Sequence, residues 1–196
     1  REISSTYTGW IDLFGWGTGD NPTNVSIDNE DYPTFVDWGV NGGNVSNAWF
    51  TLSYDEWKYL LRDRTNAEEK QGVACVNGIN GLVLLPDDWT LPSGAHFTSG
   101  FASNYGYEYF KTVNTYTASE WTLMEEAGAV FLPAAGGRNG TSMYNVGTYG
   151  CYWSSTYGSS YGAYYVYFYS GALNPSTSSS RCYGHSVRLC SEISSK

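Results

Sequence analysis

Cys182 and His185 are the side chains whose types and spacing most directly suggest chemistry, because a thiol near an imidazole can act as a nucleophile with its base. Such a pair needs a third group that orients the imidazole, and the surrounding sequence offers none. Closeness in sequence also does not by itself produce the geometry of a catalytic dyad. We therefore expect no catalytic residue, and we expect that the protein is not an enzyme.

The spacing of the four cysteines argues against a zinc site. Zinc sites built from cysteine usually contain a Cys-X-X-Cys pair. No such pair occurs among Cys75, Cys151, Cys182 and Cys190. Cys151 and Cys190 fall in expected core strands, where they either form a disulfide or remain buried free thiols.

Two acidic clusters, at residues 28–31 and 87–88, could supply oxygen ligands for calcium. Their spacing is not that of an EF-hand loop, so solvated acidic loops are the better interpretation. The glycine-rich loop at residues 136–140 lacks the lysine and the following Ser or Thr of a phosphate-binding loop. We expect no metal ion and no cofactor.

Residues 149–190 differ in composition from the rest of the chain, because they contain no Asp, Glu or Lys and are rich in Tyr, Ser and Gly. Within this segment, residues 163–169 alternate with a period of two, which predicts a strand. One face would carry Tyr164, Val166 and Phe168, and the other would carry Tyr165, Tyr167 and Tyr169. We expect Trp153, Phe168 and Val187 to be buried and the second set of tyrosines to be exposed.

Such a tyrosine-rich segment is either an ordinary sheet surface or a binding surface. Tyr favours strands, and Ser and Gly favour loops, so composition alone fits the first interpretation. A monomer rarely exposes a dense patch of tyrosines unless the patch binds a partner. Antibody paratopes rely on the same residue types. If six tyrosines each bury half of about 150–250 Å², they supply roughly 450–750 Å², close to one side of a standard interface of about 800 Å². The binding surface is the favoured interpretation.

The elements that must position this segment are two helices and several short strands. Ser53 with Glu56 forms a capping box that opens a helix running to about residue 64, and Thr117 with Glu120 opens a second helix that stops at Gly128. Apolar runs predict buried strands at residues 81–86 and 129–133, and shorter strands are expected at 150–155 and 186–190. We expect residues 1–50 to form irregular loops that are anchored by tryptophan side chains. The sequence therefore predicts one α+β domain over residues 1–196, with a loop-rich part at 1–50 and a ligand-binding segment at 149–190.

Composition excludes several classes of function. The net charge of −9 disfavours binding to nucleic acid, whose phosphates would be repelled. No run approaches 18 apolar residues, so we expect no direct membrane span. No signal peptide opens the chain at Arg1, so any targeting segment has been removed or lies outside this sequence.

Several blocks occur in an order that resembles one family, the Fibrobacter succinogenes major paralogous domain proteins of gut Bacteroidales and their phages. The blocks are residues 13–19, 56–61, 84–89, 128–136, 152–155 and 181–189. The resemblance implies a C-type lectin fold in its formylglycine-generating-enzyme-like form, with two short helices, several short antiparallel strands and long irregular loops. The calcium-dependent sugar site of C-type lectins does not carry over, since Asn174-Pro175-Ser176 and Trp153-Ser154-Ser155 replace its motifs.

Part of that family resembles the variable proteins of diversity-generating retroelements, in which Asn codons near the C-terminus are randomised. A randomised Asn codon ending in a pyrimidine cannot yield Lys, Glu, Gln, Met or Trp, and residues 157–185 contain none of these. The resemblance implies fixed scaffold at Ala163, Phe168, Pro175, Arg181, Gly184, Val187 and Arg188. It implies variable, ligand-binding positions at Tyr157, Ser159, Ser160, Tyr161, Tyr165, Tyr167, Tyr169, Gly171, Ala172, Ser178, Ser179, Ser180, Cys182, Tyr183 and His185.

These observations lead to a hypothesis of a non-enzymatic receptor-binding or adhesin protein that displays a diversified Tyr/Ser surface to a surface protein or glycan. It would act outside the cytoplasm, on a phage tail or a bacterial cell surface. The alternative is a glycan-binding module of fixed specificity. A third hypothesis, an enzyme of the formylglycine-generating type, needs a reactive cysteine pair that the sequence does not contain.

Overall fold

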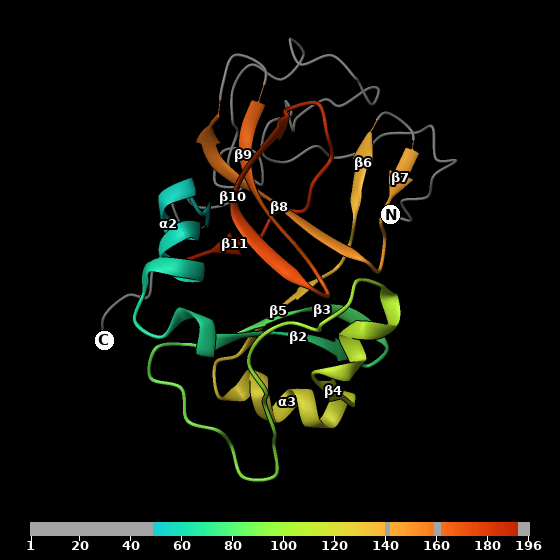
Figure 1. Cartoon of the computed structure of the whole chain (residues 1–196). Helices are drawn as coiled ribbons and strands as arrows, with labels where there is room; N and C mark the ends of the chain where they lie inside the picture. Colours follow the sequence, from blue (N-terminus) through green and yellow to red (C-terminus); the bar gives the residue numbers. More distant parts are fainter. Residues whose placement is uncertain (1–48, 140–141, 159–161, 192–196) are drawn as a thin grey trace.

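The computed structural model describes residues 49–139, 142–158 and 162–191, and it confirms a mixed α+β architecture (Figure 1). The first half contains β1 (Phe50–Thr51), α2 (Tyr54–Lys58), a π-helical turn (Tyr59–Asp63), a 3₁₀ turn (Ala67–Lys70), β2 (Gln71–Val76) and β3 (Ile79–Leu84). A second 3₁₀ turn (Tyr107–Thr112), β4 (Thr115–Tyr116), α3 (Ala118–Glu126) and β5 (Val130–Pro133) follow. The C-terminal part is built from β6 (Gly137–Asn139), β7 (Ser142–Tyr144), β8 (Tyr149–Tyr157), β9 (Gly162–Tyr169), β10 (Ala172–Ser180) and β11 (Leu189–Cys190).

Both predicted capping boxes are present. At α2 the Ser53 hydroxyl accepts a hydrogen bond from the Glu56 amide (3.3 Å), and the Glu56 carboxylate accepts one from the Ser53 amide (2.7 Å). Thr117 and Glu120 repeat this arrangement at α3. The helix ends before Gly128, whose φ is 94°. The first helix does not continue as an α-helix to residue 64, because the chain widens into the π-helical turn after Lys58.

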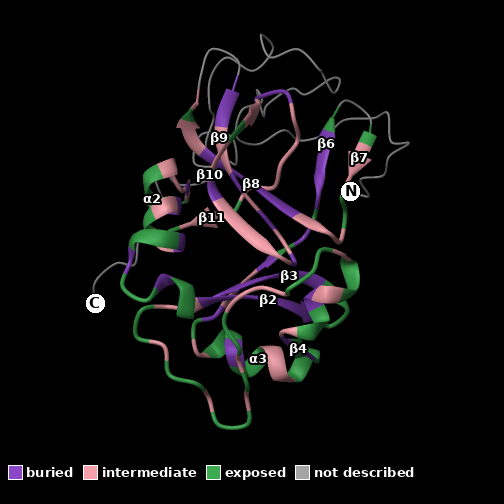
Figure 2. Cartoon of the chain, in the orientation of Figure 1, coloured by how far each residue is buried: buried purple, intermediate pink, exposed green. Residues whose placement is uncertain are grey.

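A four-stranded sheet in the order β4-β2-β3-β5 forms the lower layer of the molecule in Figure 1. Its side chains alternate between two apolar clusters. Val73, Leu82 and Leu132 pack toward the rest of the molecule, and Ala74 and Val83 pack toward α3 on the opposite face. Both faces of this sheet are therefore covered, which explains why β2 is buried along its whole length (Figure 2).

A three-stranded antiparallel sheet in the order β10-β9-β8 forms the upper layer (Figure 1). Val166 and Phe168 of β9 are fully buried, and they pack with Trp57 of α2 in the main core. Tyr152 of β8 joins this core and donates a hydrogen bond from its hydroxyl to the Pro133 carbonyl (2.8 Å), which ties the two sheets together. The predicted division of β9 into two faces is confirmed.

Tyr164 lies on the same face of β9 as Val166 and Phe168 and is half-buried, with its ring on that of Tyr54 in α2 (centroids 4.4 Å apart). Other expectations about this part of the chain need correction. Val187 is half-buried rather than buried, since it packs at the edge of a small cluster around Trp153. The expected strand at 186–190 is limited to β11, which pairs with β1. Residues 1–48, with the expected N-terminal loops, lie outside the described residues.

Candidate ligand-binding site

The three tyrosines of β9 form a continuous ladder on the face that points away from the main core. The rings of Tyr165 and Tyr167 lie 6.1 Å apart, and those of Tyr167 and Tyr169 lie 6.5 Å apart in a stacked arrangement. These side chains are half-buried rather than exposed as expected, because each ring covers part of its neighbours. The face is therefore a packed aromatic surface with its edges open to solvent.

Two tyrosines from other segments extend the ladder. Tyr149 of β8 is paired with Tyr169 in the sheet, and their rings lie 5.4 Å apart. Tyr105, in the loop before the second 3₁₀ turn, meets the Tyr169 ring edge-on at 5.6 Å and remains 57% exposed. Sequence reasoning missed both residues. The period-two pattern of β8 could have found Tyr149, but no local signal places Tyr105 here.

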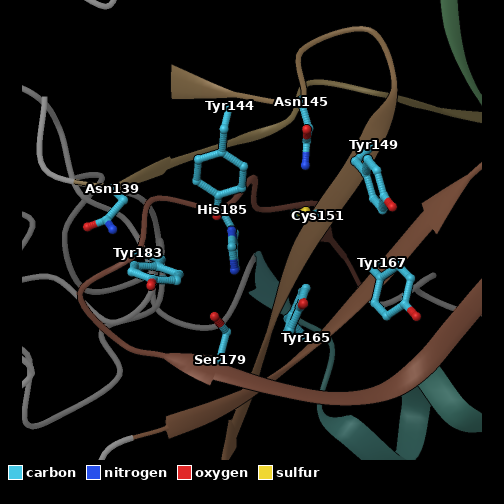
Figure 3. Close-up of a pocket in the computed structure, with 10 residues that line it drawn as sticks. All are labelled: Asn139, Tyr144, Asn145, Tyr149, Cys151, Tyr165, Tyr167, Ser179, Tyr183 and His185. Atoms are coloured by element: carbon cyan, nitrogen blue, oxygen red, sulfur yellow. The ribbon is translucent and has the colours of Figure 1, made fainter. Parts of the chain in front are cut away.

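A cavity of about 520 Å³ opens beside this ladder. Its aromatic lining consists of Tyr144, Tyr149, Tyr165, Tyr167, Tyr183 and His185. Its remaining lining residues are Asn139, Asn145, Cys151 and Ser179. Figure 3 shows these side chains grouped around His185, with contributions from the β6–β7 hairpin, from β8, β9 and β10, and from the segment after β10.

The backbone of residues 184–186 holds His185 in this position. The Trp153 amide donates to the Ser186 carbonyl, and the Ser186 amide donates to the Cys151 carbonyl (both 2.9 Å). On the other side, Gly184 and Arg138 exchange two backbone hydrogen bonds of 2.8 Å. This segment therefore lies between β8 and β6 and directs the His185 side chain into the aromatic face.

His185 is a neutral imidazole packed among aromatic rings. Its ring lies 4.3 Å from that of Trp153 and stacks on Tyr165 at 4.7 Å. Both ring nitrogens are buried, and neither makes a hydrogen bond of normal geometry among the described residues; the nearby Gly184 backbone only weakly favours the charged ring. Burial lowers the pKa of His185 to about 3, because the charged form would lose its hydration.

Cys151 lines the same cavity and is also held neutral. Burial raises the pKa of its thiol to about 11. A thiolate–imidazolium pair would show the opposite shifts, with a lowered cysteine pKa and a histidine that charges readily. Cys151 carries a free thiol, so the alternative of a disulfide with Cys190 is not realised.

The structure separates several of the residues that the resemblance implied to be variable. Ser178 pairs with Tyr164 and Ser180 with Gly162, so by strand alternation their side chains lie on the face opposite to that of Ser179. Cys182 is buried (6% exposed) against Trp153 and Ala163, so it cannot contribute to an open surface.

The other expected positions lie at the two ends of the strand pair. Gly171 lies in the β9–β10 turn beside Tyr169, and Ala172 begins β10 opposite Tyr169, at one end of the ladder. Tyr157 lies at the other end, where its ring contacts the guanidinium of Arg181. Ser159, Ser160 and Tyr161 lie outside the described residues.

Asp87, one of the acidic residues that could supply calcium ligands, contacts two cationic side chains instead. Asp87 accepts a hydrogen bond from Lys70 at 2.8 Å and contacts Arg64 at 3.3 Å, and the Lys70 ammonium helps to hold the pKa of this carboxyl below its usual value. Residues 28–31 lie outside the described part of the chain. Within residues 49–139, 142–158 and 162–191, no group of three metal-ligating side chains is found, and no helix is long and apolar enough to cross a membrane.

Comparison with known families gives a match over the C-terminal part of the chain. The model of a family described as a domain of unknown function (DUF8237) matches residues 108–190. This range contains α3, β5 and the whole three-stranded sheet, and it includes every residue that lines the cavity. No curated protein and no solved structure is significantly similar to the chain.

Proposed function

We propose that the protein is a non-enzymatic ligand-binding domain of the C-type lectin fold, which presents a diversified tyrosine-rich surface to a surface protein or glycan. The observation that carries this proposal is the tyrosine ladder of β9 with the cavity beside it. Aromatic rings with hydroxyl groups offer a large contact area and hydrogen bonding together, as they do in antibody paratopes. The domain would act outside the cytoplasm, on a phage tail or on a bacterial cell surface.

The burial pattern supports the division into variable and fixed positions. Four of the scaffold residues that the resemblance implied are buried, namely Ala163, Phe168, Pro175 and Arg181. Six of the variable positions meet at one surface, namely Tyr165, Tyr167, Tyr169, Ser179, Tyr183 and His185. Substitutions at such a surface would change the ligand while leaving the core in place. Three variable positions depart from this pattern, the buried Cys182 and the oppositely facing Ser178 and Ser180, and the scaffold residues Gly184, Val187 and Arg188 are not buried.

The chemistry of the cavity supports binding rather than catalysis. Cys151 is the one nucleophilic thiol among its lining residues, and burial raises the pKa of that thiol. His185 is a poor base, because its pKa lies far below neutral. A general base works best with a pKa near the working pH.

Binding can be tested with a double variant, Tyr167→Ser with Tyr169→Ser, on an array of bacterial surface proteins and glycans. We expect the double variant to lose at least about tenfold in affinity, because central tyrosines concentrate binding energy. Tyr59→Ser is the matched control, since Tyr59 is 56% exposed in the turn that follows α2, on the other side of the three-stranded sheet. A partner that binds the double variant as well as it binds the parent would place the site elsewhere.

Diversification can be tested at the gene itself. A neighbouring reverse transcriptase and a template copy with Asn codons at the variable positions would support a retroelement variable protein. A locus without them would favour the alternative, a glycan-binding module of fixed specificity.

A further inference from the structure

The cavity contains a polar side chain whose hydrogen-bonding capacity is unused. Both nitrogens of His185 are buried and make no hydrogen bond of normal geometry among the described residues, although the ring lines an open cavity of about 520 Å³. Buried polar groups in native proteins nearly always have a partner, and exceptions call for an explanation such as a bound molecule. The volume falls within the range of about 300–1,000 Å³ that is typical of small-molecule sites.

The lining favours an uncharged ligand. None of the described residues that line the cavity is acidic or basic apart from His185, so neither a cation nor an anion would find an opposite charge there. The pKa shifts of His185 and Cys151 agree with this, because burial stabilises the neutral form of both groups. The same environment would disfavour a charged ligand for the same reason.

The lining also favours a ligand that has both flat apolar faces and many hydroxyl groups. Tyr165, Tyr167 and Tyr183 offer aromatic faces, which attract weakly positive C–H groups. Asn139, Asn145 and Ser179 offer neutral donors and acceptors in the same space. A purely apolar side chain of a protein partner would leave these polar groups dehydrated and unpaired. A pyranose ring matches both features.

We propose that this cavity binds an uncharged pyranose, a neutral sugar residue of a surface glycan, with His185 as a hydrogen-bond partner. The inference rests on the proposed function and names the ligand class of the same surface. The His185 nitrogens are not accessible in the empty cavity, so the imidazole must turn about its last torsion to meet a hydroxyl. That torsion has broad minima, so the torsion itself opposes the turn only weakly. The site differs from a calcium-dependent lectin site, because only neutral side chains hold the sugar.

Ligand-detected NMR can test this with D-glucose, D-galactose, D-mannose, L-fucose and the N-acetylated amino sugars. Each sugar that binds is then compared with its uronic acid and its free 2-amino analogue at about pH 6, where these are an anion and a cation while His185 stays neutral. We expect saturable binding of at least one neutral sugar and binding at least about tenfold weaker for its charged analogues. The chain has two histidines, so ring resonances of labelled histidine report His185 directly, with His96 as the internal reference.

Variants test whether the sugar occupies the cavity. His185→Phe and Tyr183→Ser should each weaken sugar binding at least about tenfold, whereas the control Tyr59→Ser, which alters an exposed residue outside the cavity and the ladder, should leave it unchanged. If His185→Phe does not fold, Tyr183→Ser with the His185 resonances provides the same test. The inference is overturned if no neutral sugar binds, if charged analogues bind equally well, or if only ordered water meets His185. A macromolecular partner that depends on Tyr167 and Tyr169 but is not displaced by any sugar would overturn the inference and leave the proposed function standing.

Discussion

Neighbouring aromatic side chains of β9 have similar sizes, but some pack in the core and others form the binding surface. The Phe168 ring stacks on Tyr152 (interplanar angle 15°) inside the main core, whereas Tyr167 and Tyr169 stack on each other at the surface. A tyrosine that is already packed against its neighbours has little rotamer freedom left to lose when a ligand binds. The ladder is therefore preorganised, and its half-burial favours binding rather than opposing it.

The first prediction concerns stability at these positions. Phe168→Ala should lower the free energy of unfolding by about 3–5 kcal/mol, because it removes a fully buried aromatic ring. Tyr169→Ser, one residue further along the same strand, should cost about 1 kcal/mol or less, since its half-buried ring packs mainly on other surface tyrosines. Urea denaturation of both variants measures this difference. Equal losses would contradict the assignment of the two faces.

The second prediction concerns pH. The pKa of His185 is about 3 in the folded protein, below its unfolded value of about 6.5, so the unfolded chain binds the proton first as the pH falls. The stability due to the neutral ring is fully present above about pH 6.5 and is lost as the pH falls toward 3, at up to about 1.4 kcal/mol per pH unit.

Comparison with His185→Phe isolates this effect, because the carboxylates titrate in both proteins. The rings that contact the imidazole are those of Trp153, Tyr165 and Tyr183. None of these side chains is a carboxylate, so none of them titrates together with the imidazole as the pH falls. Thermal unfolding between about pH 7 and pH 4 should show a steeper loss for the wild type than for the variant. Parallel curves would mean that the imidazole is hydrated in the folded state.

At the scale of elements, the packing of β8 on β9 depends on the absence of a side chain at Gly150. Gly150 is paired with Phe168, and a Cβ atom there would overlap the Phe168 ring. The third prediction is that Gly150→Ala lowers stability by about 1–3 kcal/mol through overpacking. A double variant with Phe168→Leu should recover part of this loss, and a double-mutant cycle measures the coupling. Strictly additive losses would show that the glycine serves another purpose.

Some elements could be predicted from the sequence because their signals are local. The two capping boxes and Gly128 fix the ends of helices within a few residues, and the apolar runs of β3 and β5 stand out because both of their faces are buried. Strand β10 gave no such signal, since its Ser, Asn and Pro residues are typical of loops. Pairing with β9 overrides those local preferences.

The candidate site could be predicted only in part. The strand pattern found Tyr165, Tyr167 and Tyr169 because alternation alone assigns them to one face. The cavity depends on contacts between distant segments, such as the pairing of Gly184 with Arg138, which bring Tyr144 and His185 together. A single sequence contains no local signal for such pairings.

At the scale of the whole molecule, charge and binding surface are separated. The chain has a net charge of −9, yet the segment 149–190 contains no acidic residue, and its only charges are Arg181 and Arg188. Arg181 is buried, so the tyrosine face itself is nearly neutral. The acidic remainder would repel anionic polymers, whereas an uncharged ligand would approach without electrostatic steering.

The last prediction follows from this separation. Binding through the tyrosine face should change by less than about threefold in affinity between about 50 and 500 mM salt, because no ion pair needs to form. In binding to duplex DNA, each contact to a phosphate would instead make the slope of log affinity against log salt concentration more negative by about 0.9. Titrations of the identified partner across this range measure the slope, with the double variant Tyr167→Ser and Tyr169→Ser as the control for binding elsewhere. A steep loss of affinity with salt that persists in the double variant would locate the interaction on a charged part of the molecule. A steep loss that disappears in the double variant would mean that the ligand of the tyrosine face is itself charged, in conflict with the neutral lining of the cavity.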